Sequence, residues 1–111
     1  MAFQNIVGNR LAQAALTTSY VTVYTTPLLT RTYVKNIDIV NTTASALSFY
    51  ISLVPSGGTA GSGNALFYNA PINGRTTVQW TGSEILTPGD LISVKASAAG
   101  VTVTITGGEA T

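Results

Sequence analysis

An alternation of apolar and polar residues with a period of two runs through most of this chain and favours β-strands. In residues 101–106, three aliphatic side chains fall on one face and three threonines on the other. Residues 46–54 and 91–98 alternate in the same way. Because successive side chains of a strand point to opposite faces of a sheet, each segment is expected to bury one face.

Other segments carry weaker strand patterns. In residues 33–41, Ile37 and Ile39 share a face that Val34 does not. Either both faces are partly buried, or a bulge near Lys35 and Asn36 shifts the phase. The alanine-rich residues 10–16 are too short for a stable lone helix, so we expect a strand there. Further strands are predicted at residues 20–26, 66–72 and 75–81.

Turn-forming residues separate these segments at regular intervals. Asn73-Gly74 predicts a tight hairpin turn, because both residues tolerate positive φ. Residues 87–90, Thr-Pro-Gly-Asp, predict a type II turn. The longest loop, residues 55–64, has no large side chain. About eight or nine short strands at this spacing predict an all-β fold, an antiparallel β-sandwich of jelly-roll type over residues 10–111.

The scarcity of charge limits the chemistry available to the chain. Only 8% of its 111 residues are charged, and it has no histidine and no cysteine. The usual general base and the strongest nucleophile are therefore missing. We predict a non-enzymatic protein with no catalytic, cofactor-binding or metal-binding residues.

The four carboxylates leave one enzymatic alternative. Two carboxylates facing one groove can hydrolyse glycosides. The favoured interpretation is that Asp90 closes the Pro-Gly turn and that Glu84 and Glu109 are solvated. No acidic loop has the spacing of a calcium site. The carboxylates of the sequence are Asp38, Glu84, Asp90 and Glu109.

The charge and hydropathy patterns also exclude several partners. The net charge is +1, and the five basic residues are scattered, so no nucleic-acid partner is expected. No apolar run reaches the length of a membrane helix, so no membrane partner is expected. The first seven residues lack the basic and apolar regions of a signal peptide.

Two segments carry apolar residues that the predicted sandwich does not bury. Residues 1–9 have no evident strand partner and are predicted to form an N-terminal arm. Leu28 and Leu29 follow Pro27, where a turn is normally polar. Tyr50 faces away from Phe49 and Ile51 and is the best candidate for an exposed aromatic residue. The predicted interface residues are Phe3, Ile6, Val7, Leu28, Leu29 and Tyr50.

The tyrosines and Trp80 raise the alternative of a carbohydrate-binding module, because aromatic rings stack on sugars. An interface is favoured, since tyrosines are common there and no acidic or amide cluster accompanies the rings to hold sugar hydroxyls.

Several stretches resemble small β-sandwich virion proteins of tailed bacteriophages over roughly residues 10–107. In place of the Gly-containing turn that such proteins often have after the proline, this chain has Leu28-Leu29. The stretches that carry the resemblance are Leu11-Ala12-Gln13, Leu16-Thr17-Thr18-Ser19-Tyr20, Tyr24-Thr25-Thr26-Pro27, Thr32-Tyr33-Val34-Lys35-Asn36-Ile37, Asn41-Thr42-Thr43-Ala44-Ser45-Ala46, Leu53-Val54-Pro55-Ser56-Gly57-Gly58-Thr59-Ala60-Gly61 and Leu91-Ile92-Ser93-Val94-Lys95-Ala96-Ser97-Ala98.

The resemblance implies a structural role in a phage particle that assembles in the host cytoplasm. The leading hypothesis is a capsid decoration (cement) protein that forms a homotrimer and binds the major capsid protein. The alternative within the same class is a tail, neck or fibre component of the virion. The resemblance implies no catalytic residue and no cofactor.

Overall fold

The computed structural model describes residues 5–111, which form eight strands and one short 3-10 helix, η1 (Ser62–Asn64). The strands are β1 (Ile6–Ala15), β2 (Val21–Thr25), β3 (Arg31–Asn41), β4 (Leu47–Val54), β5 (Ala65–Ile72), β6 (Thr77–Leu86), β7 (Leu91–Ala96) and β8 (Val101–Ala110).

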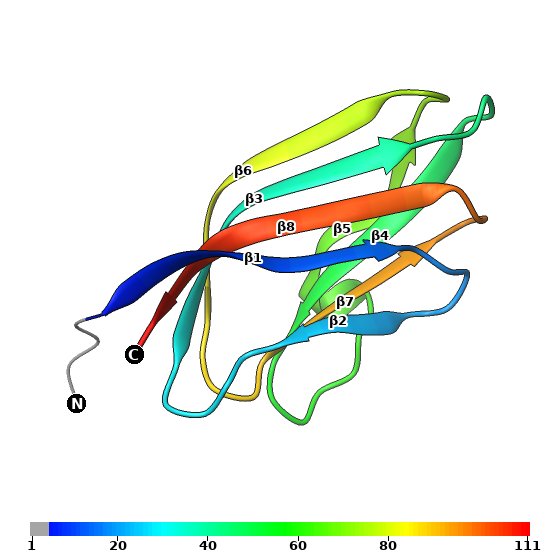
Figure 1. Cartoon of the computed structure of the whole chain (residues 1–111). Helices are drawn as coiled ribbons and strands as arrows, with labels where there is room; N and C mark the ends of the chain where they lie inside the picture. Colours follow the sequence, from blue (N-terminus) through cyan, green and yellow to red (C-terminus); the bar gives the residue numbers. More distant parts are fainter. Residues whose placement is uncertain (1–4) are drawn as a thin grey trace.

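The strands form two four-stranded antiparallel sheets that face each other (Figure 1). One sheet has the order β1-β8-β3-β6 and the other the order β2-β7-β4-β5. Among the strands of residues 5–111, only β4 and β5 are both consecutive and hydrogen-bonded, because every other connection between consecutive strands crosses from one sheet to the other. Eight antiparallel strands in two sheets with these long-range pairings form a jelly roll, which confirms the predicted fold class.

The core lies between the sheets and is almost entirely aliphatic. The phase change predicted in β3 is a bulge, since the register with both β6 and β8 shifts between Val34 and Asn36. That shift lets Val34 and Ile37, an odd number of residues apart, both be buried. The largest fully buried side chains are Phe49, Ile37, Ile39, Ile51, Ile72, Ile92, Ile105, Val34, Val54, Val94, Val101 and Val103.

The first strand has a partner that the sequence did not reveal. Ile6 and Val7 pair with Ala110 and Glu109 at the end of β8. The expectation that these two residues lack a strand partner is therefore wrong. Phe3 lies outside the described residues, and the division into an arm of residues 1–9 and a sandwich of residues 10–111 stays a prediction.

The turn predictions had different outcomes. At the Pro-Gly turn, the Asp90 N–H donates to the Thr87 carbonyl over 3.0 Å and Gly89 has φ 87°, which confirms a turn. The hairpin predicted at Asn73-Gly74 is wrong, because β5 and β6 belong to different sheets. There Arg75, rather than either predicted residue, takes the positive φ of 54°.

Candidate interaction surface

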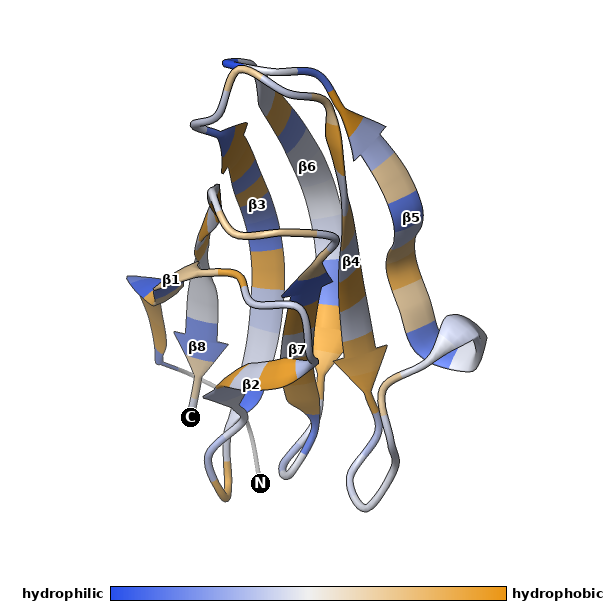
Figure 2. Ribbon diagram, turned by 90° about the vertical axis from the view of Figure 1, so that its right-hand side faces the viewer, coloured by the Kyte–Doolittle hydropathy of each residue, from blue (hydrophilic) through white to orange (hydrophobic). Residues whose placement is uncertain are grey.

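Four of the predicted interface residues lie at one end of the sandwich. Ile6 and Val7 begin β1, and Leu28 and Leu29 lie at the tip of the β2–β3 loop, which is hydrophobic at its tip in Figure 2. Their exposed fractions are 65% and 60% for Ile6 and Val7, and 83% and 68% for Leu28 and Leu29. Solvent exposure of four large aliphatic side chains at one end of a small domain is typical of an interaction surface. We call this group the apolar end.

The backbone of the β2–β3 loop is strained at the apolar end. Leu29 has φ 57°, in the left-handed region that costs a residue with a Cβ roughly 1–2 kcal/mol. A glycine at this position would adopt this conformation without strain. A buried threonine supports the loop, since the Thr30 hydroxyl donates to the Leu28 carbonyl over 3.1 Å.

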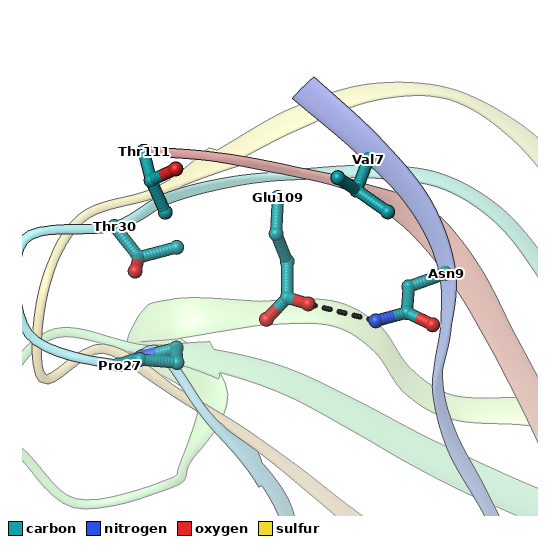
Figure 3. Close-up of a pocket in the computed structure, with 6 residues that line it drawn as sticks. All are labelled: Val7, Asn9, Pro27, Thr30, Glu109 and Thr111. Carbon is teal, nitrogen blue, oxygen red and sulfur yellow. Dashed lines mark hydrogen bonds between the residues drawn. The ribbon is translucent and has the colours of Figure 1, made fainter. Parts of the chain in front are cut away.

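A cavity of about 360 Å³ opens between the start of β1, the end of β8 and the β2–β3 loop (Figure 3). Its wall is apolar at Val7 and Pro27, and the Glu109 carboxylate points into it. The cavity is lined by Val7, Asn9, Pro27, Thr30, Glu109 and Thr111.

Hydrogen bonds to Glu109 join three strands across the two sheets. The Tyr24 hydroxyl of β2 donates to Oε2 of Glu109 over 2.6 Å, and Asn9 Nδ2 of β1 donates to Oε1 over 3.0 Å. The Tyr24 oxygen also lies 2.8 Å from the hydroxyl oxygen of Thr32, which is fully buried. Glu109 is thus a structural carboxylate rather than the freely solvated one that the sequence suggested.

The network shifts the pKa values of both of its ionisable members. Burial, together with the hydrogen bond to Glu109, raises the pKa of Tyr24 to about 12. The hydrogen bonds from Tyr24 and then from Asn9 hold the pKa of Glu109 below its ordinary value of 4.5. At neutral pH the Glu109 side chain in the cavity is therefore an anion held by neutral donors.

Asp90 and Asp38 have local hydrogen-bonding roles. Asp90 accepts from the N–H groups of Thr87 and Ser56, each over 2.9 Å, as expected of a residue that closes the turn. Although burial alone would raise the pKa of Asp90, these hydrogen bonds lower it. Asp38 accepts from Asn36 over 3.0 Å. Within residues 5–111 no group of three or more potential metal-ligating side chains is found, and no helix is long and apolar enough to cross a membrane.

Tyr50 lies apart from the apolar end, in β4 of the other sheet. Its ring meets those of Tyr20 and Tyr68 edge-on, with interplanar angles of 72° and 88°. Lys95 Nζ lies 4.3 Å from the Tyr50 ring centroid and 4.8 Å from that of Tyr20. Because the rings are nearly perpendicular and an ammonium group occupies two of their faces, they do not form the flat platform that sugar stacking requires.

Neither a protein-family model nor a curated protein sequence matches this chain. A search of solved structures found a similar fold in a chain from Bacillus endospore appendages, a family of disulfide-linked pili. That match has a TM-score of 0.52 and 15% identity and covers 100% of this chain and 94% of the other. Because identity is so low, the likeness shows the fold alone, and the absence of cysteine here rules out disulfide linkage in this chain.

A chain in the structure of infectious bursal disease virus, Gx strain, is a weaker match. Its TM-score is 0.49 at 11% identity, and the match covers 96% of this chain but 32% of the viral one. This chain therefore spans about a third of the length of the viral chain.

The structure thus brings four of the six predicted interface residues together, while Tyr50 lies elsewhere and Phe3 lies outside the described residues. Sequence reasoning missed Glu109 and Tyr24, because their contact joins residues 85 positions apart. It also missed Ile85, which is 56% exposed on β6.

Proposed function

We propose that this chain is a non-enzymatic structural subunit of a virion, specifically a decoration protein on the outside of a tailed-phage capsid. In this role it forms homotrimers and binds the major capsid protein. The observation that carries the proposal is the apolar end, where Ile6, Val7, Leu28 and Leu29 are exposed together in a chain with few charges. The resemblance to tailed-phage virion proteins is the reason for proposing a tailed-phage capsid as the particle.

The mechanism is burial of the apolar end against the capsid shell. Burying an exposed aliphatic side chain contributes about 1.5–3 kcal/mol, so four of them contribute several kcal/mol before the entropic cost of association. The strained backbone at Leu29 supports this role, because residues in sparsely populated conformations cluster at binding sites. Repeated over a shell, such contacts oppose its expansion by internal pressure.

Co-sedimentation with capsids that lack this protein tests the proposal. Wild-type protein is expected to sediment with the capsids, and a variant carrying both Leu28→Ser and Leu29→Ser is expected to stay in the supernatant. Val21→Ser is the matched control, because Val21 is 44% exposed on β2 and lies outside the apolar end. Binding to isolated tails instead would favour the tail, neck or fibre alternative, and binding to neither would refute the proposal.

A further inference from the structure

Among residues 5–111, no further strand pairs with the two long edges of the sheet β1-β8-β3-β6. Its outer strands, β1 and β6, have ten residues each and are exposed along most of their length. Each carries one charged residue, Arg10 in β1 and Glu84 in β6. A free strand edge presents unpaired N–H and C=O groups, which another strand can satisfy.

The edges of the opposite sheet are blocked. Strand β2 has five residues and an irregular register with β7. Strand β5 contains Pro71 and two register irregularities, and its Asn69 has φ 49°. Short strands and prolines are usual means of preventing edge-to-edge pairing, whereas β1 and β6 have ten residues each, no proline and a single register irregularity each. The contrast singles out β1 and β6 as the edges that can accept a further strand.

The direction of the two free edges suits a second copy of the same chain. The pairs β1–β8, β8–β3 and β3–β6 are all antiparallel, so β1 and β6 run in opposite directions. When a second copy lies beside the first in the same orientation, its β6 is antiparallel to β1 of the first. The antiparallel sheet then continues from one copy to the next.

The two edges also bend at the same level. The register of β1 shifts between Arg10 and Ala12, where β8 passes from Thr106 to Ile105. The pairings of β3 with β6 and with β8 both shift register between Val34 and Asn36. These two residues pair with Gly107 and Thr106 of β8. Because bulges bend strands, irregularities at neighbouring levels give β1 and β6 similar bends, so the edges can follow each other.

The edge charges select among the possible pairings. Two antiparallel β1 edges in full overlap would place Arg10 beside its equivalent, because Arg10 lies at the middle of β1. A β1–β6 pairing brings opposite charges together instead. Within one copy, Asn9 lies at the same level of the sheet as Glu84, one residue from Arg10. Like charges near each other across a ladder are destabilising and opposite charges are favourable.

We propose that a second copy of this chain adds its β6 to the free edge of β1 and continues the sheet through main-chain hydrogen bonds. This is a head-to-tail contact, which closes into a ring, such as the proposed trimer, when the rotation between copies allows, and otherwise forms an open chain. The inference rests on the self-association included in the proposed function and assigns the contact between copies to β1 and β6.

Cross-linking tests which strands meet. The chain has no cysteine, so single cysteines can be placed at will. Gly8 and Ile85 lie at one level of the sheet, in the row of Gly108 and Tyr33. A Cβ at Gly8 meets nothing within 4 Å, and Ile85 is exposed, so Gly8→Cys and Ile85→Cys are compatible with the fold.

A mixture of the two single variants, treated with a short bismaleimide linker, is expected to give several-fold more covalent dimer than either variant alone. Facing residues on paired strands have Cα atoms about 4.5–5.5 Å apart, within reach of the linker. Equal dimer in the single-variant samples and the mixture, or no dimer in any sample, would overturn the inference.

A proline variant tests the main-chain hydrogen bonds separately. Asn5 and Thr111 exchange both of their backbone hydrogen bonds, so by alternation the N–H of Gly8 faces the free edge. Gly8→Pro removes this donor and is expected to keep the fold but to lower the associated fraction several-fold in sedimentation equilibrium, whereas Gly8→Ala keeps the donor and is expected to associate like the wild type. Equal association of the two variants would contradict strand addition.

The outcomes separate this inference from the proposed function. If the protein sediments with capsids but the β1–β6 cross-link is absent, the inference fails and the proposed function stands. If the cross-link forms but no virion part is bound, the proposed function fails and the strand pairing stands.

Discussion

Removal of the Tyr24 hydroxyl tests whether the hydrogen-bond network across the sandwich stabilises the fold. Tyr24→Phe deletes the donor that lies 2.6 Å from the Glu109 carboxylate and the partner 2.8 Å from the buried Thr32 hydroxyl. A hydrogen bond to a charged group contributes about 1.5–3 kcal/mol when water cannot replace it. Because Glu109 lines an open cavity and water can reach it, we expect a loss of about 1–2 kcal/mol.

The loss translates into a measurable shift. For a domain of this size, about 1 kcal/mol corresponds to about 4 °C in the thermal midpoint, so Tyr24→Phe is expected to melt about 4–8 °C lower at pH 7. Tyr68→Phe is the matched control, because it deletes the same atom from a ring that is 58% exposed. Its midpoint is expected to stay close to that of the wild type.

The pH dependence follows from the direction of the two pKa shifts. The pKa of Glu109 is lowered on folding, so its contribution to stability is complete above about 4.5 and is lost as the pH falls through the folded-state value. The pKa of Tyr24 is raised from 10.0 to about 12, so its contribution is complete below 10 and is lost as the pH rises toward 12. The difference between wild type and Tyr24→Phe should therefore be largest between these limits and shrink in acid. Equal midpoints at pH 7, or an undiminished difference at pH 3, would refute the reasoning.

Three further substitutions test the packing and the turns, with thermal or urea unfolding as the measurement. Phe49→Ala empties a fully buried site and is expected to cost about 3–5 kcal/mol, against less than about 1 kcal/mol for Ile85→Ala on the exposed face of β6. Asp90→Ala removes the acceptor of the Pro-Gly turn and is expected to destabilise at pH 7, with the loss fading in acid because the pKa of Asp90 is lowered on folding. Gly107→Ala places a Cβ against the backbone carbonyl of β3 and is expected to cost about 1–3 kcal/mol, whereas Gly8→Ala, with open space at its Cβ, is expected to cost less.

Much of the fold could be predicted because the alternation of side chains survives wherever one face of a strand is buried. Residues 101–106 lie inside β8, and residues 46–54 contain β4. Near Lys35 and Asn36 the alternation changes phase, because a bulge there adds one residue to β3 relative to β8. The pattern weakens at the sheet edges. The second half of β6 is largely exposed, so residues 82–86 were not predicted as strand.

The remaining errors concern contacts between distant residues. Glycines such as Gly107 and Gly108 have low strand propensity, so the sequence suggested that the strand ends before them. In the structure β8 continues to Ala110, because the missing side chain of Gly107 lets the β3 backbone come close. The hairpin predicted at Asn73-Gly74 assumed that consecutive strands pair, whereas the jelly roll sends them to different sheets.

The candidate surface was predicted in part for a similar reason. Exposed apolar residues such as Leu28 and Leu29 are visible in the sequence because they sit where a turn should be polar. The contact between Tyr24 and Glu109 depends on which strands face each other across the core, which a single sequence does not encode locally.

Electron cryo-microscopy of the virion that is proposed to carry this chain tests the central claim most directly. The proposed function predicts jelly-roll density, about 48 × 26 × 18 Å per copy, on the outer surface of the head, with the loop that carries Leu28 and Leu29 against the shell. Particles whose head carries no such density, while this chain is recovered only outside the virion, would contradict it.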